Sequence, residues 1–276
     1  MLNNSNLSII FDDSPIARAY LSILIDLKLT NIKIYNLTNK YFFLEKVNHK
    51  INFINKNFNS IKFVKNLSLF KFKEEVENYF GFNNGFIDNM FKVNNFYLFK
   101  NSEIIYDRDV NSQVLFKYLS NSNTRFILNT SHKIFKNILD INKDFIHIHP
   151  GYLPDVKGAD GILNSLMHKN EIGCTAFYME KKIDQGKIIK RIKYKLPKFR
   201  YLNLSNYDNN ELYNIWYSFF DPLLRASLLK ELFSKQEFEI TEQQPNQGKY
   251  YSFIDKKKIK EILKKITHEN IDNFKN

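Results

Sequence analysis

The sequence LSIIFDDSPIARAYLSILIDLKLTNIKIYNL, residues 7–37, decides the fold. Its first five residues form a short apolar run, which predicts a buried strand. Ser14 is a suitable N-cap and Pro15 a suitable first helical residue, and the apolar residues that follow recur at helical spacing to about residue 27. Residues 31–37 predict the next strand. A strand, a helix and a strand at this spacing form a βαβ unit, so we expect an α/β fold with a parallel sheet.

The same alternation continues through the middle of the chain. Apolar runs predict strands at residues 125–128, 145–149, 173–179 and 188–194. Helical spacing predicts helices at residues 72–80, 85–91, 110–119 and 132–139.

The tail has a different pattern. Residues 211–233 are helical in their spacing, and Pro222 should kink or restart this helix. Residues 238–241 and 249–253 flank the turn-forming segment 245–248 and predict a hairpin, and residues 256–266 predict a basic amphipathic helix. With a linker near residues 198–210, we expect a catalytic domain over residues 1–200 and a helix and hairpin region over residues 201–276.

Composition excludes several classes of protein. The 276 residues are 43% hydrophobic and include 26 Phe and 16 Tyr, far more apolar surface than a disordered chain carries. No stretch approaches the roughly 20 apolar residues of a membrane span, and the N-terminus lacks the basic flank of a signal peptide. Cys174 is the only cysteine, so no intrachain disulfide can form. We therefore expect a cytoplasmic protein without a membrane partner.

The formal net charge of +12 suggests a nucleic-acid partner at first sight. However, only six of the 41 basic residues are arginine, the residue that binds phosphates and bases with two parallel hydrogen bonds. The lysines are spread along the whole chain. The charge therefore favours a solvated surface over a nucleic-acid interface.

Candidate chemistry is concentrated in FIHIHPGYLPDVKGADG, residues 145–161. His147 and His149 are two residues apart on a predicted strand, so both point to one face, and Pro150 and Gly151 end the strand behind them. They lie at its carboxyl end, where open α/β sheets bind ligands. Asp184 follows the adjacent strand and can meet them there.

Three readings of these residues remain open on residue type alone. A histidine next to a carboxylate is a common general acid and base pair. Two histidines and Asp184 could instead bind zinc or iron. A strand histidine can also be purely structural.

Several segments in this part of the chain resemble the 10-formyltetrahydrofolate-dependent formyltransferases. They are HPGYLP at residues 149–154, the following Gly158, GCTAFY at residues 173–178 and IDQGKII at residues 183–189. The resemblance covers about residues 125–189 and implies a Rossmann-like, mainly parallel sheet. It also implies 10-formyltetrahydrofolate as co-substrate. In the short members of the family this motif lies nearer the N-terminus than it does here, which implies an insertion at about residues 41–100 of this chain.

The resemblance also implies the roles of the catalytic residues. His149 matches the family's catalytic histidine and Asp184 its catalytic aspartate. His147 stands where the family has an asparagine that donates a hydrogen bond to the oxyanion, a role worth roughly 3–4 kcal/mol in comparable sites. This chain departs from the family there, and we expect the imidazole N–H of His147 to replace the amide.

Further contacts follow from the same resemblance. The pterin should lie against the strand-end loops, with cofactor contacts at Asn129, Thr130, Ser131, Gly151, Leu153, Pro154 and Asp155. Substrate contacts are expected at Ser14, Gly158 and Tyr250. Asp13-Ser14-Pro15 occupies the place of the family's Gly-Ser/Thr-Pro turn but lacks its glycine, and a helix cap would explain Ser14 equally well.

The resemblance implies that the acceptor is an amine, and residues 243–251 resemble a hairpin of the sugar-nucleotide N-formyltransferases. A phosphate-bearing amino-sugar nucleotide is therefore the expected acceptor, and a homodimer is plausible by analogy. Methionyl-tRNA formyltransferase and formyl-folate hydrolase are alternatives within the family. A non-catalytic folate-binding protein and a metal site at His147, His149 and Asp184 are alternatives outside it.

Overall fold

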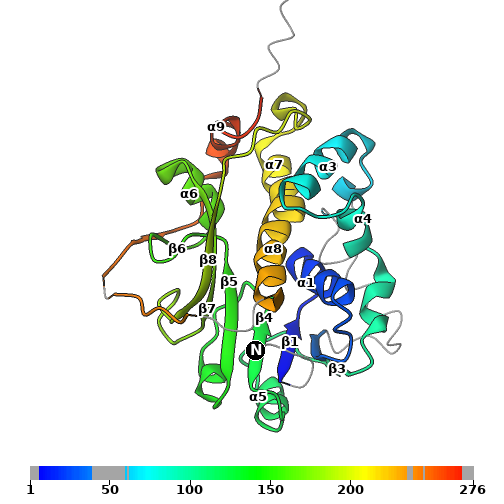
Figure 1. The fold of residues 1–276 in the computed structure, drawn as a ribbon, viewed down its shortest axis with the longest axis vertical. Coiled ribbons are helices and arrows are strands. Elements are labelled where there is room, and N and C mark those ends of the chain that lie inside the picture. Colours follow the sequence, from blue (N-terminus) through cyan, green and yellow to red (C-terminus); the bar gives the residue numbers. More distant parts are fainter. Residues whose placement is uncertain (1–5, 39–59, 61, 235–238, 245, 269–276) are drawn as a thin grey trace, which may run out of the picture.

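The computed structural model describes residues 6–38, 60, 62–234, 239–244 and 246–268, and its centre is one seven-stranded sheet (Figure 1). The strand order is β3-β2-β1-β4-β5-β7-β8. The first five of these strands are parallel, while β7 and β8 are antiparallel to their neighbours. This arrangement confirms the expected α/β class with a mainly parallel sheet.

The bounds of the strands and helices are as follows. The strands are β1 (Leu7–Phe11), β2 (Lys33–Leu37), β3 (Ser102–Ile105), β4 (Phe126–Asn129), β5 (Asp144–His149), β6 (Val156–Gly158), β7 (Ile172–Tyr178), β8 (Ile188–Tyr194) and β9 (Lys249–Tyr251). The helices are α1 (Pro15–Asp26), α3 (Phe70–Tyr79), α4 (Phe86–Met90), α5 (Gln113–Ser120), α6 (Gly161–Lys169), α7 (Asn209–Ile215), α8 (Asp221–Ser234) and α9 (Ile259–Lys264).

The first βαβ unit forms as the sequence predicts. The hydroxyl of Ser14 accepts a hydrogen bond from the Ala17 N–H at 3.2 Å, and Pro15 begins α1. Every residue of β1 is buried because both faces of the sheet are covered, which explains a continuous apolar run instead of an alternating one.

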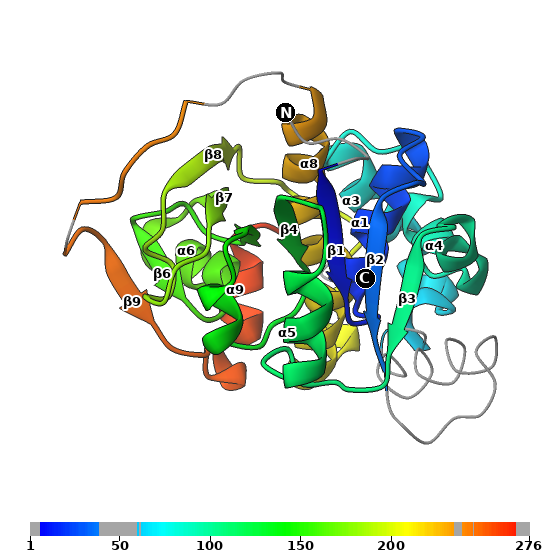
Figure 2. The same cartoon turned by 90° about the horizontal axis from the view of Figure 1, so that it is seen from below.

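Helices cover the two faces of the sheet (Figure 2), and buried side chains form a separate core on each face. On one face, Ile9 and Phe11 of β1 share a core with α1, α6 and α8. On the other face, Ile10 of β1 packs with Leu115 and Leu119 of α5. Because α8 shares a core with α1, the tail of the chain is built onto the sheet. The domain division at residue 200 stays a prediction.

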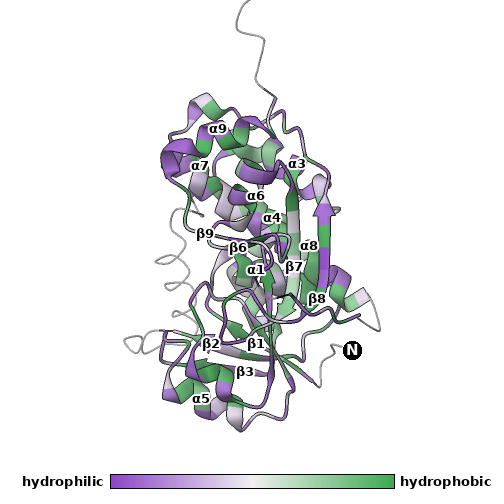
Figure 3. Ribbon diagram, turned by 90° about the vertical axis from the view of Figure 1, so that its left-hand side faces the viewer, coloured by the Kyte–Doolittle hydropathy of each residue, from purple (hydrophilic) through white to green (hydrophobic). Residues whose placement is uncertain are grey.

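The edge strand β8 contains both hydrophobic and hydrophilic residues (Figure 3). Ile188 and Ile189 are buried, whereas Lys190, Arg191 and Lys193 are partly or fully exposed. Charged side chains on an edge strand discourage pairing with another sheet.

Among the described residues, no helix combines the length and apolar character needed to span a membrane.

The turn between β1 and α1 contains a buried ion pair. Asp13 adopts the left-handed conformation at φ 56°, which costs free energy for a residue with a side chain. Its carboxylate lies 2.7 Å from the Arg18 guanidinium, and both side chains are almost completely buried. Asp13 stands at the position of the glycine in the Gly-Ser/Thr-Pro turn of the resembled family, and Arg18 of α1 holds its carboxylate in place.

Replacing Arg18 with methionine should destabilise the protein by about 3–5 kcal/mol, because Asp13 would be left as a buried charge without its cation. Urea unfolding followed by circular dichroism measures this change. An Arg18→Met variant within 1 kcal/mol of wild type, on the order of a surface substitution, would contradict this role for the pair.

Residues 132–139 do not form the predicted helix. They contain only a 3-10 helix at Asn137–Asp140. The side chain of Asn111 donates to the Ile134 carbonyl at 3.0 Å and accepts from the Lys136 N–H at 2.7 Å. The backbone groups that a helix would pair internally are therefore bonded to a distant side chain.

The predicted hairpin in the tail is also wrong, although residues 238 and 245 lie outside the described residues. Thr241 pairs with Ile188, whereas β9 pairs in parallel with β6. Gly248 explains why this segment approaches β6 so closely. It has φ 78°, and a Cβ there would lie 1.6 Å from the carbonyl oxygen of Pro154.

The helix around Pro222 continues through a local change of helix type. Between α7 and α8, Trp216–Phe220 forms a π-helical turn, and Pro222 then lies in the first turn of α8. Proline has no N–H to donate and its ring crowds the preceding turn of the helix, and the wider π-helical turn before Pro222 makes room for it.

The expected 41–100 insertion contains α3 and α4, while its residues 41–59 and 61 lie outside the described part.

Candidate functional site

A cavity of about 1000 Å³ opens at the carboxyl ends of β4 and β5. The order of the strands reverses between β1 and β4, and ligands of open α/β sheets bind at such points. His147, His149 and Asp184 all line this cavity. The structure therefore brings together the three residues that the sequence singled out.

Asp184 reaches the histidines from the loop between β7 and β8. It has φ 54°, and its Oδ2 accepts a hydrogen bond from the Gly158 N–H at 2.8 Å. The Gln243 side chain donates to the carbonyls of Asp184 and Gly186 at 3.2 and 2.7 Å. A Cβ at Gly186 would lie 1.7 Å from the Tyr178 carbonyl oxygen, so only glycine fits this loop. The carboxylate is held at a defined position.

The contacts of His149 leave Nδ1 as the basic nitrogen of its ring. Its Nε2 lies 2.9 Å from the Val156 carbonyl oxygen, which can only accept, so Nε2 carries a proton. In the neutral ring Nδ1 is then unprotonated, and it lies 3.7 Å from Asp184 Oδ2. Burial lowers the pKa of His149, and Arg225 lowers it further, while Asp184 raises it. A proton taken up by Nδ1 would face a carboxylate.

His147 lies beside it as a neutral ring. Burial, then the charges of Arg225, His149 and His132, hold the pKa of His147 well below its ordinary value, and the Asn129 carbonyl opposes this effect more weakly. The His147 Nδ1 lies 3.2 Å from Asn129 Nδ2. The ring packs edge to face on Phe177, with 5.8 Å between centroids. A neutral imidazole offers one N–H donor.

Arg225 is a residue of this site that the sequence analysis missed. It enters from α8, lines the cavity, and donates to the Ile148 carbonyl, between the two histidines, at 2.6 Å. Its Nε donates to Asp221 Oδ2 at 3.0 Å, and both side chains are buried. The available signal was that Arg225 is the only charged residue in the segment LLRASLL, residues 223–229. The positive charge beneath His147 and His149 favours their neutral forms.

A polar cluster on the far side of the cavity was also missed. Asp160 Oδ1 accepts hydrogen bonds from the hydroxyls of Tyr213 and Tyr217, at 3.0 and 2.7 Å. Its Oδ2 accepts from the Ile254 N–H at 2.9 Å. Burial raises the pKa of both tyrosines, so they stay protonated donors. Tyr213 lies in α7 and Tyr217 in the π-helical turn that follows it, and the sequence analysis did not predict this turn.

The remaining predicted residues fall into two groups. Asn129, Ser131, Gly158 and Tyr250 line the cavity. The others serve the surrounding backbone: Ser14 caps α1, Thr130 bonds the Ile10 carbonyl, Leu153 bonds the Thr175 hydroxyl, and Pro154 and Asp155 contact Gly248. Gly151 permits close approach, because a Cβ there would lie 2.7 Å from His149 Nε2. Their contacts with a ligand stay predictions.

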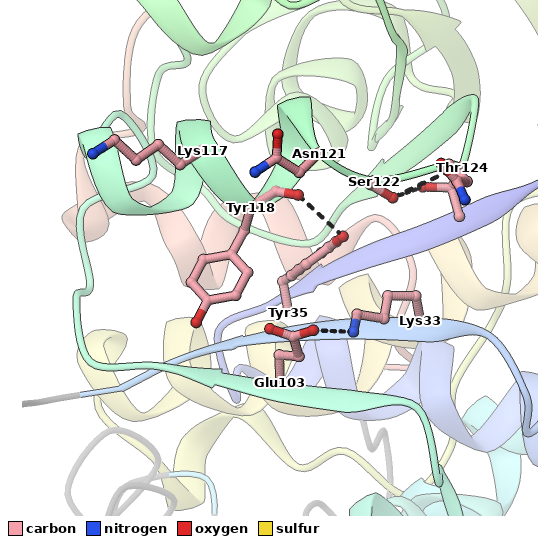
Figure 4. Close-up of a pocket in the computed structure, with 9 residues that line it drawn as sticks. Lys33, Tyr35, Glu103, Lys117, Tyr118, Asn121, Ser122 and Thr124 are labelled. Atoms are coloured by element: carbon pink, nitrogen blue, oxygen red, sulfur yellow. Dashed lines mark hydrogen bonds and ion pairs between the residues drawn. The ribbon is translucent and has the colours of Figure 1, made fainter.

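Metal binding gains no support from the described residues, where no group of three or more His, Cys, Asp or Glu side chains is arranged to hold an ion. A second cavity of about 530 Å³ lies at the opposite, amino end of β2 (Figure 4). Its Lys33 and Glu103 pair with each other, and the Tyr35 hydroxyl points to the Tyr118 carbonyl at 3.5 Å. None of the three residues His147, His149 and Asp184 lines this second cavity.

Comparison with known proteins identifies the central segment. Residues 133–198 match the protein-family model described as "Formyl transferase", which confirms the resemblance seen in the sequence. No curated protein matches the sequence.

Three solved structures are similar to this chain, and the first of them shares its fold. A 4-N formyltransferase from Francisella tularensis is similar over 99% of this chain and 92% of its own, with 15% identity and a TM-score of 0.51. A sugar N-formyltransferase from a Shewanella species is similar over 97% and 90%, with 16% identity and a TM-score of 0.48. An N-formyltransferase from Helicobacter canadensis is similar over 90% and 70%, with 14% identity and a TM-score of 0.46.

Proposed function

We propose that this chain, which carries a formyl transferase segment over residues 133–198, is an N-formyltransferase that moves a formyl group from 10-formyltetrahydrofolate to the amine of an amino-sugar nucleotide. The observation that carries the proposal is the arrangement of His149 and Asp184. The Nδ1 of a buried, neutral histidine faces a fixed carboxylate at 3.7 Å, next to a second histidine in the same cavity. This is the geometry of a general base beside an oxyanion donor.

The three side chains divide the chemistry of acyl transfer. His149 Nδ1 takes the proton of the attacking amine as the new C–N bond forms. Asp184 stabilises the imidazolium, and His147 donates its N–H to the oxygen that becomes negative. Bound 10-formyltetrahydrofolate would supply the formyl group, and its nitrogen would receive a proton as the old C–N bond breaks. His149 is the source of that proton, so the ring ends neutral.

The cavity suits a flat pterin ring next to His147. Its lining on this side is apolar and includes Phe135, Phe177, Met179 and Ile183. Its volume lies at the upper end of the range for small-molecule sites, so a donor and an acceptor can lie there together. Asn129 and Ser131 provide polar groups at the edge of this apolar region.

The acceptor side suits a nucleotide sugar. Tyr250 and Phe253 line the rim and are 51% and 76% exposed, so each ring can stack on a base. Lys249 and Lys256 are close in the sequence to these rings and supply positive charge for a diphosphate. Asp160 and its two tyrosines offer hydrogen bonds to sugar hydroxyls.

We also propose a cytoplasmic location.

A direct assay tests this function. The protein is incubated with 10-formyltetrahydrofolate and a panel of amino-sugar nucleotides, and free tetrahydrofolate is followed by its absorbance. Release that requires an amine supports the transferase, whereas equal release without an amine indicates a hydrolase. Tight folate binding without release for any amine, methionyl-tRNA included, would show a non-catalytic binding protein.

The pH dependence of the rate follows from His149. Its lowered pKa means that the ring is a competent base above that pKa and loses activity as pH falls through it. We therefore expect full activity at pH 7 and an acid limb of kcat/KM below the ordinary histidine value of about 6.5. Asp184→Asn should move this limb to still lower pH, because Asp184 raises the pKa of His149. A limb above pH 7 would contradict this assignment.

A further inference from the structure

We propose that Asn129 is a positioning residue that selects the tautomer of His147, so that the ring presents Nε2–H to the reacting oxygen. The proposal deepens the function proposed above and rests on it. It concerns the one position at which this chain replaces the amide expected from related sequences with an imidazole. An amide always offers an N–H, whereas an imidazole does so from one nitrogen only, and that nitrogen has to be the correct one.

The orientation of the Asn129 amide is determined by the backbone of Ser131. Asn129 Oδ1 accepts the Ser131 N–H at 2.7 Å, and Asn129 Nδ2 donates to the Ser131 carbonyl at 3.2 Å. Exchanging the amide oxygen and nitrogen would place donor against donor and acceptor against acceptor. The NH₂ group therefore faces His147.

This orientation decides which nitrogen of His147 carries the proton. The amide nitrogen lies 3.2 Å from His147 Nδ1 and can only donate, so Nδ1 has to accept. The neutral ring then carries its proton on Nε2, and His147 lines the cavity. Asn129 is the last residue of β4, and the residue before it, Leu128, pairs with Ile146, the residue before His147, so the two parallel strands bring the side chains of Asn129 and His147 to the same edge of the sheet.

Burial and nearby charges keep the His147 ring neutral. Burial lowers its pKa most, and the charges of Arg225 from α8, His149 on the same strand and His132 from the loop after β4 lower it further, while the Asn129 backbone carbonyl opposes them more weakly. With one proton and one fixed hydrogen bond, the ring has a single donor. His147 thereby reproduces the N–H of an asparagine, provided that Asn129 is present.

The decisive variant is Asn129→Asp, which replaces a donor by an acceptor at nearly constant shape. An ionised carboxylate facing Nδ1 can only accept, so it keeps a proton on Nδ1. Below the raised pKa of His147 the imidazolium still offers Nε2–H, and above that pKa the neutral ring keeps its proton on Nδ1 and loses the donor. We expect formyl transfer to fall by about 10²–10³-fold as pH rises through this pKa, the loss typical of one oxyanion donor.

Two further variants separate this role from a structural one. In an Asn129→Asp, His147→Asn double variant the amide at position 147 does not titrate, so the alkaline loss should disappear. Asn123→Asp adds the same charge at an exposed position before the amino end of β4, at the second cavity, and should keep the wild-type profile. An Asn129→Asp profile that matches wild type, or an alkaline loss that persists in the double variant, would overturn the proposal.

Nitrogen-15 NMR of histidine-labelled protein reads the tautomer without any catalysis. The signals of His147 are those lost in His147→Asn. In wild type they should show a proton on Nε2 and none on Nδ1, and in Asn129→Asp a proton on Nδ1. A wild-type proton on Nδ1, bound to the Asn129 carbonyl, would overturn the inference even if the enzyme is active. The predicted tautomer in a protein without formyl transfer would leave this inference standing and remove the proposed function instead.

Discussion

Replacing His149 with alanine is expected to reduce kcat for formyl transfer by about 10²–10⁴-fold, the usual contribution of a positioned general base. The reason is geometric. His149 Nδ1 is the basic nitrogen that faces Asp184, and its other nitrogen is committed to the Val156 carbonyl. Steady-state release of tetrahydrofolate with an amino-sugar nucleotide measures the change.

His149→Ala also removes a buried hydrogen bond, so loss of activity alone would not distinguish chemistry from folding. His149→Gln is the matched control, because the glutamine amide can donate to the Val156 carbonyl but cannot take up a proton. We expect this variant to melt within a few degrees of wild type while its rate is reduced almost as far. A His149→Gln enzyme with the wild-type rate would show that the proton of the amine is removed by another group.

Replacing Arg225 with methionine is expected to destabilise the protein by about 3–5 kcal/mol. Asp221 is completely buried, and its Oδ2 accepts from the Arg225 Nε. Its Oδ1 has no hydrogen-bond partner among the described residues. Without the guanidinium the carboxylate would be a buried charge with no compensation, and the Ile148 carbonyl would lose its donor. Urea unfolding followed by tryptophan fluorescence reports the loss.

The partner of this ion pair provides the control. Removing both charges, in Arg225→Met with Asp221→Leu, should recover most of the lost stability, because an apolar pair needs no compensation in the core. A single variant as stable as wild type would mean that the pair does not hold α8 on the sheet.

The pH dependence of the rate should report the effect of the Arg225 charge on the two histidines. Arg225 lowers the pKa of both histidines, so Arg225→Met should move the acid limb of the rate toward higher pH. Arg225→Lys keeps the charge and should leave the limb near its wild-type position.

Local sequence patterns were sufficient for the part of the fold that positions the histidines. Ser14, Pro15 and the apolar repeat that follows them specify α1 without help from distant residues. The strand that carries His147 and His149 is recognisable because Pro150 and Gly151 end it at a defined place. The chemistry at its carboxyl end then follows from the topology of parallel sheets.

The wrong or missing predictions concern segments whose structure depends on residues far away in the sequence. Residues 132–139 have a helical pattern, but the Asn111 side chain bonds their backbone. β9 was expected to pair within its own hairpin, and it pairs instead with β6, a strand too short to detect by alternation. Arg225 could not be placed at the histidines from sequence, because nothing local indicates that α8 crosses behind β5.

The parallel pairing of β9 with β6 has a consequence for how the protein matures on the ribosome. His147, His149 and Asp184 emerge together with the strands that carry them, and this part of the sheet can assemble first. Tyr250 and the backbone that bonds Asp160 emerge only after a further stretch of chain has been made. A nascent chain therefore contains His147, His149 and Asp184 before it contains Arg225 and Tyr250, which line the same cavity, so the cavity is complete only after the tail has been made.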